Sequence, residues 1–297
     1  MKRRTVLPGI LAGIIIGLAV AGCGTQTSGT VRELPPVQAA LVQGDLTYQD
    51  VLEKGGFLQF AAKSPDASRI WLGTHSGLYA SANDKLWVLS SPDVGEDDVA
   101  GLFIDPADPR RIFIGGQGIC KFSSDGGQTW KTIDQGLPKG ANIRSFAGIR
   151  QKEKVELYAY VAEDGIYQFT DGGQKWEKWL SIDQEVYAMA FHPAQQRLYL
   201  VTQSGLLSVG EEPLRSEPVP DVKQVYSLAI DSQDDALYLS TDIGVLIQNG
   251  SDWTPHTAKA PEQFVLLGPG FGSDKIVAVG ESAALYTLTK GKWRKWE

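Results

Sequence analysis

Three acidic residues, Glu163, Asp242 and Glu281, recur beside predicted hairpin turns in different parts of the chain. Two carboxylates that face each other across a cleft can hydrolyse a glycosidic bond by acid–base catalysis. Acidic residues in loops are common, however, and no nucleophile of recognisable spacing accompanies these three. They are therefore the catalytic candidates of an alternative hypothesis, a carbohydrate-active hydrolase. The main hypothesis assigns no catalytic residue.

Other reactive residue types show no pattern that indicates a metal, a cofactor or nucleic acid. The three histidines, His75, His192 and His256, fall in different kinds of loop and lack the spacing of metal ligands. Cys120 stands alone in a predicted strand and is expected to be a small buried hydrophobic residue. A net charge of −7 argues against nucleic-acid binding, which needs a basic surface. We expect no metal and no cofactor.

The unit that the chain repeats is Ile112–Trp130, IFIGGQGICKFSSDGGQTW. Two apolar runs flank a glycine cluster, and this pattern predicts a β-hairpin. Glycine supplies the positive φ that such a tight turn needs. The turn residue recurs every 39 to 47 positions, at Gly77, Gly118, Gly165, Gly205, Gly244 and Ala283.

Each hairpin is preceded by another apolar strand, and in five of the six repeats it is followed by a strand that carries tryptophan. Four strands in about 40 residues is the period of a propeller blade. The predicted innermost strands are 57–62, 99–104, 143–149, 186–191, 225–230 and 264–268. The sequence therefore predicts an all-β, six-bladed β-propeller of four-stranded antiparallel blades over residues 53–297.

The repeated unit ends in a motif, Ser123-x-Asp125-x-Gly127-x-Thr129-Trp130. Asp125 can accept hydrogen bonds from turn amides, and Gly127 can adopt a backbone angle that is closed to other residues. Trp130 can pack on the neighbouring strand. The motif is expected to stabilise a turn and to lie away from any active site.

A second, imperfect copy keeps Asp171, Gly173 and Trp176. The motif matches the Asp-box, and residues 57–297 resemble the Asp-box or BNR-repeat propellers. That group includes sialidases, photosystem II assembly factors, sortilin-type receptor domains and many bacterial lipoproteins. The resemblance implies the fold and says little about activity.

Two members of the group suggest different functions. Resemblance to sialidases implies an arginine cluster, a Tyr–Glu nucleophile pair and an acidic Asp, a pattern that this chain does not carry. Its arginines fall mostly on turns at the other end of the strands, which leaves Arg144 at the predicted channel mouth. Resemblance to photosystem II assembly factors implies a non-enzymatic scaffold, although that family has seven blades.

The N-terminus resembles a bacterial lipoprotein signal. Lys2, Arg3 and Arg4 precede an apolar core at residues 10–21, and Val20-Ala-Gly-Cys23 matches a lipobox. A transmembrane anchor is the alternative, but this core is too short for a comfortable span. We predict a signal peptide at residues 1–22 and a lipidated Cys23 followed by a flexible tether to residue 52. The propeller would then be held at a bacterial cell membrane, facing the outside of the cytoplasmic membrane.

Ligands of propellers usually bind where the central channel opens, between the loops that enter each innermost strand and those that join the second and third strands. The candidate ligand face predicted from these loops comprises His75, Gln117, Arg144, Glu163, Asp164, Gln203, Lys223, Asp242 and Glu281. This face is mostly acidic and amide-bearing. It suits a protein or glycan partner, and the sequence predicts a monomeric, non-catalytic binding or assembly module.

Overall fold

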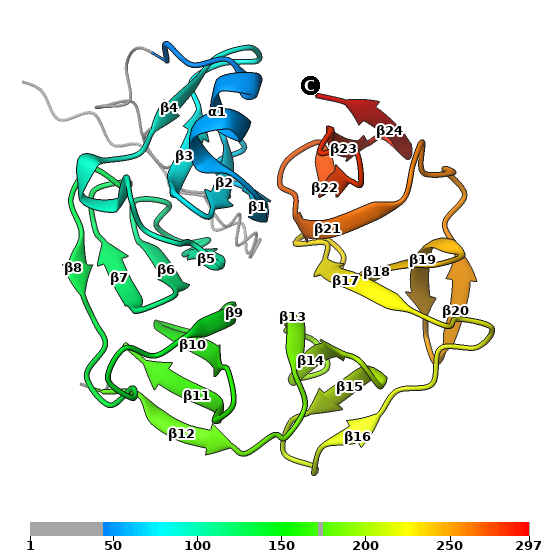
Figure 1. Ribbon diagram of the computed structural model, residues 1–297. Helices are drawn as coiled ribbons and strands as arrows, with labels where there is room; N and C mark the ends of the chain where they lie inside the picture. The colour runs from blue at the N-terminus through cyan, green and yellow to red at the C-terminus, as the bar shows by residue number, and fades with distance from the viewer. Residues whose placement is uncertain (1–43, 172–174, 297) are drawn as a thin grey trace, which may run out of the picture. The chain divides into compact units, whose positions relative to one another are not determined.

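Six four-stranded antiparallel sheets form a ring of blades around a central channel (Figure 1). The computed structural model describes residues 44–171 and 175–296. Each sheet takes its four strands from one continuous stretch of chain, and no strand is exchanged between the described blades. The prediction of a six-bladed β-propeller is confirmed. The predicted signal peptide, Cys23 and residues 24–43 of the predicted tether lie outside the described residues.

The blades follow one another along the chain. Blades 1 to 3 comprise β1 (Leu58–Lys63), β2 (Ile70–Thr74), β3 (Gly77–Ser81), β4 (Trp87–Leu89), β5 (Gly101–Ile104), β6 (Ile112–Gly116), β7 (Ile119–Ser123), β8 (Lys131–Thr132), β9 (Ile143–Gln151), β10 (Lys154–Val161), β11 (Gly165–Thr170) and β12 (Glu177–Leu180). Blades 4 to 6 comprise β13 (Val186–His192), β14 (Arg197–Thr202), β15 (Gly205–Val209), β16 (Arg215–Ser216), β17 (Val225–Ile230), β18 (Leu237–Thr241), β19 (Gly244–Asn249), β20 (Asp252–Pro255), β21 (Phe264–Pro269), β22 (Asp274–Gly280), β23 (Leu285–Thr289) and β24 (Lys292–Lys295). A helix, α1 (Tyr48–Gly55), precedes the first blade, and a 3₁₀ turn, η1 (Pro92–Val94), follows β4.

The six predicted hairpin turns join the second and third strands of the blades. The turn residues Gly77, Gly118, Gly165, Gly205, Gly244 and Ala283 all have φ between 62° and 150°. These are left-handed conformations that glycine adopts without steric cost. Ala283 pays a steric penalty for the same turn, because its Cβ crowds the backbone there.

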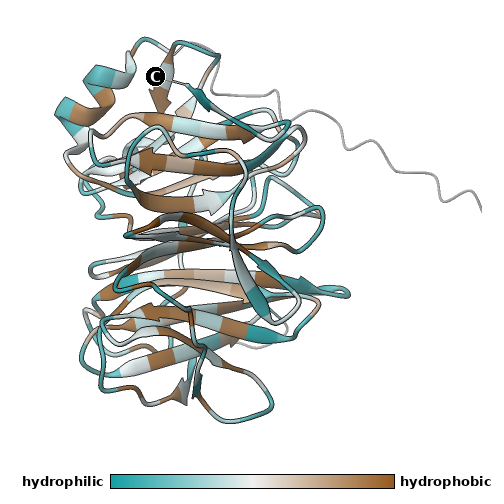
Figure 2. Cartoon of the chain, turned by 90° about the vertical axis from the view of Figure 1, so that its right-hand side faces the viewer, coloured by the Kyte–Doolittle hydropathy of each residue, from teal (hydrophilic) through white to brown (hydrophobic). Residues whose placement is uncertain are grey.

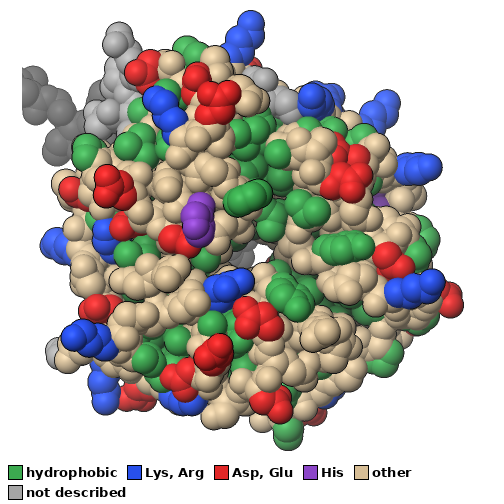
Figure 3. All heavy atoms as spheres, in the orientation of Figure 1, with side chains coloured by type: hydrophobic (Ala, Val, Ile, Leu, Met, Phe, Trp, Pro, Cys, Tyr) green, Lys and Arg blue, Asp and Glu red, His purple; other side chains and the backbone are tan. Residues whose placement is uncertain are grey.

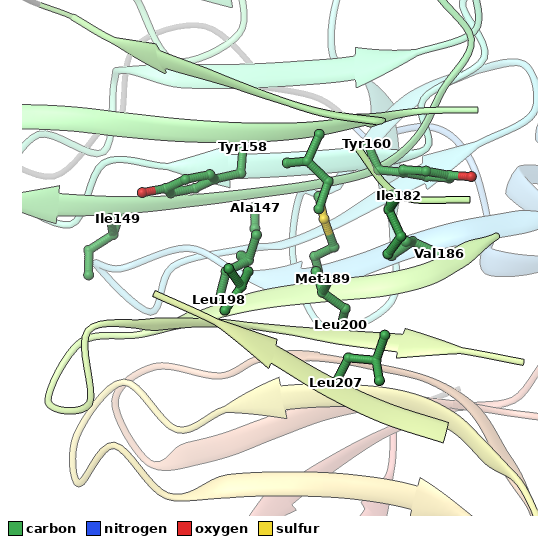
Figure 4. Close-up of a cluster of buried hydrophobic side chains, with 12 residues drawn as sticks. Ala147, Ile149, Tyr158, Tyr160, Ile182, Val186, Met189, Leu198, Leu200 and Leu207 are labelled. Atoms are coloured by element: carbon green, nitrogen blue, oxygen red, sulfur yellow. The ribbon is translucent and has the colours of Figure 1, made fainter. Parts of the chain in front are cut away.

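The hydrophobic core lies between neighbouring blades. The second strands β2, β6, β14 and β18 are buried along their whole length because a blade packs on each of their faces. Between blades 3 and 4, Ala147 and Tyr158 pack against Met189 and Leu198 (Figure 4). Apolar positions follow the strands, and hydrophilic positions gather at the turns (Figure 2).

Small residues let the innermost strands approach each other closely. A Cβ added at Gly101 of β5 would collide with Phe146 of β9, and one at Gly148 of β9 would collide with Phe103 of β5. Larger residues at these two positions would push neighbouring blades apart, which makes the glycines part of the packing between blades 2 and 3.

Helix α1 packs across the junction between blades 1 and 6. Thr47 caps the helix: its side chain accepts a hydrogen bond from Asp50 N, and Asp50 bonds back to Thr47 N. Val51 is fully buried among residues of β2 and β22. The Tyr48 hydroxyl donates to the carbonyl of Ala283, in the β22–β23 turn, at 2.6 Å. Residues 48–52, predicted above to be part of the flexible tether, therefore belong to the folded domain, because Tyr48 and Val51 are buried.

Direct contacts between the first and last blades complete the ring. Gly268 of β21 lies so close to Ala61 of β1 that a Cβ on the glycine would overlap the Ala61 carbonyl oxygen. At the outer edge, Trp87 stacks edge-on against Trp296 with ring centroids 5.3 Å apart. The two end blades share no strand, because β1 to β4 form one sheet and β21 to β24 another. Packing between the two blades therefore closes the ring.

In the part of the chain that the structure describes, no helix is long and apolar enough to cross a membrane.

Candidate functional site

Two sets of loops lie side by side at one end of the channel. The first set leads into the innermost strands, and the second joins the second and third strands. The Glu281 amide donates to the Gln263 carbonyl within blade 6, at 2.9 Å, and the Gly118 amide of blade 2 donates to the Ala141 carbonyl at the entry to blade 3, at 2.8 Å. We call this end of the ring the mouth face. It faces the viewer in Figures 1 and 3, and a narrow opening marks its centre.

Irregular strand pairing turns one side chain outward at the start of most innermost strands. The register shifts by one residue in β1, β9, β13, β17 and β21, which is the mark of a β-bulge. The residues skipped by the register are Gln59, Arg144, Tyr187, Tyr226 and Val265. Their preceding neighbours in blades 3 to 6 are buried, so each bulge re-aims a single side chain toward the mouth face.

Hydrophobic side chains are exposed along one side of the mouth. The large hydrophobic residues that are exposed in the described chain are Phe57, Tyr187, Tyr226, Ile243 and Val265, with exposed fractions of 37% to 84%. All of them lie in mouth-face loops or at the starts of innermost strands in blades 1, 4, 5 and 6. We call these five residues the apolar arc. Figure 3 shows hydrophobic side chains gathered on one side of the central opening. Large apolar side chains that gather on one face in this way favour an interaction surface.

Charged groups pair with one another along the other side of the mouth. His75 Nδ1 lies 3.1 Å from an Asp98 carboxylate oxygen, and Gln59 also donates a hydrogen bond to Asp98. Arg144 Nε lies 3.8 Å from Glu185. Because Arg144 and His75 are more than half exposed, water and salt screen these contacts. We call His75, Asp98, Arg144 and Glu185 the charged arc.

The nine predicted ligand-face residues all lie in mouth-face loops or at the start of an innermost strand. Among the described residues, none of the nine lines the central cavity. Asp164 binds Lys178 and accepts a hydrogen bond from the Tyr167 hydroxyl at 2.7 Å. Burial, and then this carboxylate, raise the pKa of Tyr167 to about 12. Asp164 is thus already engaged within its own blade.

The three candidate catalytic carboxylates lie in three different blades. Within the described chain, no hydrogen bond or ion pair joins the side chains of Glu163, Asp242 and Glu281 to one another. Asp242 accepts hydrogen bonds from the backbone amides of Lys223 and Gln224 at 3.0 and 3.1 Å. The Gln224 amide, foremost, lowers the pKa of Asp242, so this carboxylate is held ionised and fixes the loop that enters β17.

A tyrosine–glutamate contact at the mouth was missed from the sequence. The Tyr160 hydroxyl lies 3.2 Å from both the Gln184 carbonyl oxygen and a Glu185 carboxylate oxygen. Burial, and then the charge of Glu185, raise the pKa of Tyr160, so the phenol keeps its proton. This is the opposite of what a tyrosine nucleophile requires.

The central channel holds a cavity of about 300 Å³. Its walls come from all six innermost strands and are mostly apolar, with Phe60, Leu102, Phe146, Met189 and Leu228 among them. Small residues of the innermost strands, such as Ala147 and Ala190, also line it. The cavity is therefore mainly apolar, with a minority of polar side chains in its wall.

Ion pairs surround the end of the cavity that lies away from the mouth. Fully buried Asp105 accepts from Arg150 Nη1 at 2.6 Å and from Arg111 Nη1 at 2.9 Å. Lys63 pairs with Asp274 across the junction between blades 1 and 6. Lys63 and Arg150 both line the cavity. Their charges are matched by these carboxylates, so the pairs hold neighbouring blades together.

The β7–β8 turn lies at the end of the strands opposite the mouth, where the Gly126 amide donates to Arg110 in the β5–β6 turn at 2.9 Å. Asp125 accepts from the amides of Gln128 and Thr129, both at 3.0 Å. The Trp130 indole donates to the Gly127 carbonyl at 3.1 Å.

In blade 3, Asp171 pairs with Arg111 at 2.8 Å, and Trp176 is buried with its indole nitrogen on the Ile133 carbonyl at 2.7 Å. Gly173 lies outside the described residues.

Most of the apolar arc was missed from the sequence. A tyrosine in the third position of the runs EVYAM and QVYSL was the available signal, because it interrupts a series of small, channel-facing residues. Its exposure depends on the bulge, and a bulge depends on pairing with a strand elsewhere in the blade.

Solved structures of other propellers resemble this ring. A Niastella koreensis GH74 enzyme matches with a TM-score of 0.58 at 15% identity, over 82% of this chain and 45% of that one. An ancestral GH74 enzyme matches with a TM-score of 0.54 at 16% identity, over 79% of this chain and 36% of that one. The extracellular domain of a B. thetaiotaomicron protein described as a hybrid two-component system matches with a TM-score of 0.53 at 13% identity, over 86% of this chain and 34% of that one.

These likenesses show a shared propeller fold. This chain spans less than half the length of each of the three structures. No protein-family model and no curated protein matches the sequence.

Proposed function

We propose that this chain is a membrane-anchored, extracytoplasmic β-propeller that binds a protein or glycan partner at its mouth face and catalyses no reaction. The apolar arc carries this proposal. Five large hydrophobic side chains are held in water by rigid blades and all lie on one face. Exposed apolar surface of this kind favours association, because a partner removes it from water.

The carboxylates at the mouth support binding over hydrolysis. A glycoside hydrolase needs two carboxyl groups about 5–10 Å apart, one of them with a raised pKa so that it can donate a proton. Asp242 has a lowered pKa and is fixed by backbone amides. The phenol of Tyr160 stays protonated.

The proposed location rests on the lipobox that ends at Cys23 and on the resemblance of the β7–β8 turn to an Asp-box. Asp-box propellers include many bacterial lipoproteins. One structure with the same fold is an extracellular domain, which agrees with a position outside the cytoplasmic membrane.

Site-specific photo-crosslinking in cells tests the binding proposal. A photo-reactive residue in place of Tyr226, on the apolar arc, is expected to form an adduct with a partner. The matched control replaces Arg110, which is exposed in the β5–β6 turn at the opposite end of the ring. Equal adducts at both positions, or none at Tyr226, would refute a partner at the mouth face.

A screen of chromogenic glycosides with the full chain tests the absence of catalysis. We expect no turnover. Turnover that Glu163→Gln, Asp242→Asn or Glu281→Gln abolishes would replace the binding proposal with the hydrolase.

A further inference from the structure

The apolar arc continues into the central cavity. Tyr187 is half exposed at the mouth and also lines the cavity, as does the bulge residue Gln59. Below them the wall is mostly apolar, and the cavity volume of about 300 Å³ lies at the lower end of the range for small-ligand pockets, roughly 300–1,000 Å³. A single bulky apolar side chain that enters from the mouth would therefore contact mainly apolar groups.

Acidic groups surround the apolar arc. The mouth-face loops of blades 4 to 6 are residues 181–185, 203–204, 217–224, 242–243, 256–263 and 281–284. Glu185 pairs with Arg144 of the charged arc at 3.8 Å, and Glu217 pairs with Arg215 at 2.8 Å. The other acidic residues of these loops are Asp183, Asp221, Asp242, Glu262 and Glu281, and their lysines are Lys223 and Lys259. This excess of negative charge on one side of the ring attracts a cationic partner.

Two of these carboxylates are fixed in place. Glu262 accepts hydrogen bonds from the Ser282 amide at 2.8 Å and from the Tyr286 hydroxyl at 2.8 Å. Asp242 is held by two backbone amides. Glu281 is exposed and lies in the same turn as Ser282. Its backbone amide donates to the carbonyl of Gln263, two residues before Val265 of the apolar arc, so the turn lies beside that arc.

We propose that the partner presents a peptide segment in which one bulky apolar side chain, flanked by lysine or arginine, enters the channel mouth. The apolar residue contacts the apolar arc and the upper cavity wall, while the cations lie against the acidic loops of blades 4 to 6. This inference rests on the proposed function and narrows it to one class of partner.

The chemistry of the surface disfavours the two other classes of occupant. A glycan needs several hydrogen-bonding groups for its hydroxyls, whereas Val265, Ile243 and Phe57 offer none. A bacterial lipid surface that carries anionic headgroups would be repelled by the acidic loops, since membrane-surface segments rely on lysine and arginine. A basic, apolar peptide satisfies both the apolar arc and the charge.

A displayed library of random peptides, selected on the full chain, tests this inference. Enriched peptides are expected to contain an aromatic or large aliphatic residue flanked by lysine or arginine. Their binding should weaken at least about threefold between roughly 0.05 and 0.5 M salt, because exposed charges are screened over shorter distances as salt rises. Enrichment of acidic or uncharged peptides would overturn the proposal.

Matched variants then locate the binding site. Tyr226→Ala and Val265→Ala are each expected to weaken binding of an enriched peptide about fivefold or more, since both remove apolar contact at the centre of the surface. Glu281→Lys should weaken it to a similar extent. Glu163→Lys makes the same charge change in the equivalent turn of blade 3, beside the charged arc, and should alter binding less than about twofold. Equal effects of the two charge reversals would refute the placement in blades 4 to 6.

Soluble oligosaccharides and vesicles with anionic lipids are tested on the same variants. Binding of either probe that Tyr226→Ala abolishes, without enrichment of basic peptides, would replace the peptide with that class. A photo-adduct from position 226 with no enrichment of basic, apolar peptides would refute this inference and leave the proposed function intact. Absence of both the photo-adduct and the enrichment of basic, apolar peptides would refute the two proposals together.

Discussion

Among single residues, Ala283 in the β22–β23 turn departs from the glycine of the other repeats, and the steric cost of this change can be measured. Ala283 occupies the left-handed position that glycine fills in the other five blades, with φ of 62°. An alanine there costs roughly 1 kcal/mol more than glycine, partly offset by the greater freedom of glycine in the unfolded chain. Ala283→Gly is therefore expected to raise the free energy of unfolding by up to about 1 kcal/mol, measured by denaturant titration.

The opposite substitution in blade 4 is the matched control. A Cβ on Gly205 would meet no atom within 4 Å, so Gly205→Ala introduces backbone strain without a collision. It should lower the free energy of unfolding by about 1 kcal/mol. A stabilising effect of Gly205→Ala would show that the steric argument is wrong.

The contribution of Asp125 to stability is expected to depend on pH. Burial acts to raise the pKa of Asp125, but hydrogen bonds from Thr129, Ser123 and Gln128 outweigh it and hold the pKa below the ordinary value of 3.8. The unfolded chain therefore takes up this proton at a higher pH than the folded chain. The stability that Asp125 contributes is fully present above about pH 4 and is lost as the pH falls through the lower folded value.

Two variants separate charge from hydrogen bonding at this turn. Asp125→Asn keeps an acceptor oxygen and should flatten the decline of stability below about pH 4 in urea titrations. Asp125→Ala should lower the free energy of unfolding at neutral pH by about 1 kcal/mol, because water replaces part of the lost bonding at this partly exposed turn. Partner binding should persist in both variants, since the turn lies at the end opposite the mouth.

Local signals were enough to predict the blades. The glycine turns and the alternation of apolar runs lie within about 40 consecutive residues, and the predicted strand 225–230 coincides with β17. The candidate ligand face was only partly predicted. Its loops were placed at the mouth, but the exposure of Tyr187 and Tyr226 follows from bulges in strand pairing. Neighbouring residues in the sequence do not determine that pairing.

At the level of strands and helices, no local sequence pattern predicts how the ring closes. Closure depends on contacts between residues about 200 positions apart, such as Ala61 with Gly268 and Tyr48 with Ala283. Residues 48–52 of helix α1 were predicted to belong to the flexible tether. The helix contributes to the fold by burying Val51 against both end blades, a contact that no local sequence pattern reveals.

Close approach of β1 and β21 at the junction between the first and last blades is expected to be essential for stability. A methyl group at Gly268 would overlap the Ala61 carbonyl oxygen, so β1 and β21 would have to separate. Gly268→Ala is expected to lower the free energy of unfolding by about 3 kcal/mol, the upper end of the cost of overpacking. Val265→Ala, in the same strand but on the exposed mouth face, should change stability by less than about 0.5 kcal/mol. Similar losses for the two variants in thermal and urea unfolding would contradict this account of ring closure.

At the scale of the whole molecule, the ring combines a rigid scaffold with an adaptable surface. The ion pairs around Asp105 and Asp274 join blades at the end opposite the mouth. At the mouth, single bulge residues face outward and contribute little to the core. Substitutions there change the surface without disturbing the blades, which is how one fold can serve many functions.

Attachment to a membrane is the last prediction, and it concerns Cys23, which lies outside the described residues. The lipobox predicts that the signal peptide is cleaved before Cys23 and that this cysteine is lipidated. Two lipid signals are enough for stable anchoring, whereas a single short chain binds a membrane only reversibly. Cys23→Ser is therefore expected to leave either an unprocessed protein that keeps its apolar signal segment or a protein released from the detergent phase in phase-partitioning experiments. Cys120→Ala removes the other cysteine, which is buried in the ring, and should leave both processing and partitioning unchanged. A Cys23→Ser protein that is still cleaved and still partitions with the detergent would refute the lipoprotein assignment, while the propeller and its mouth face would stand.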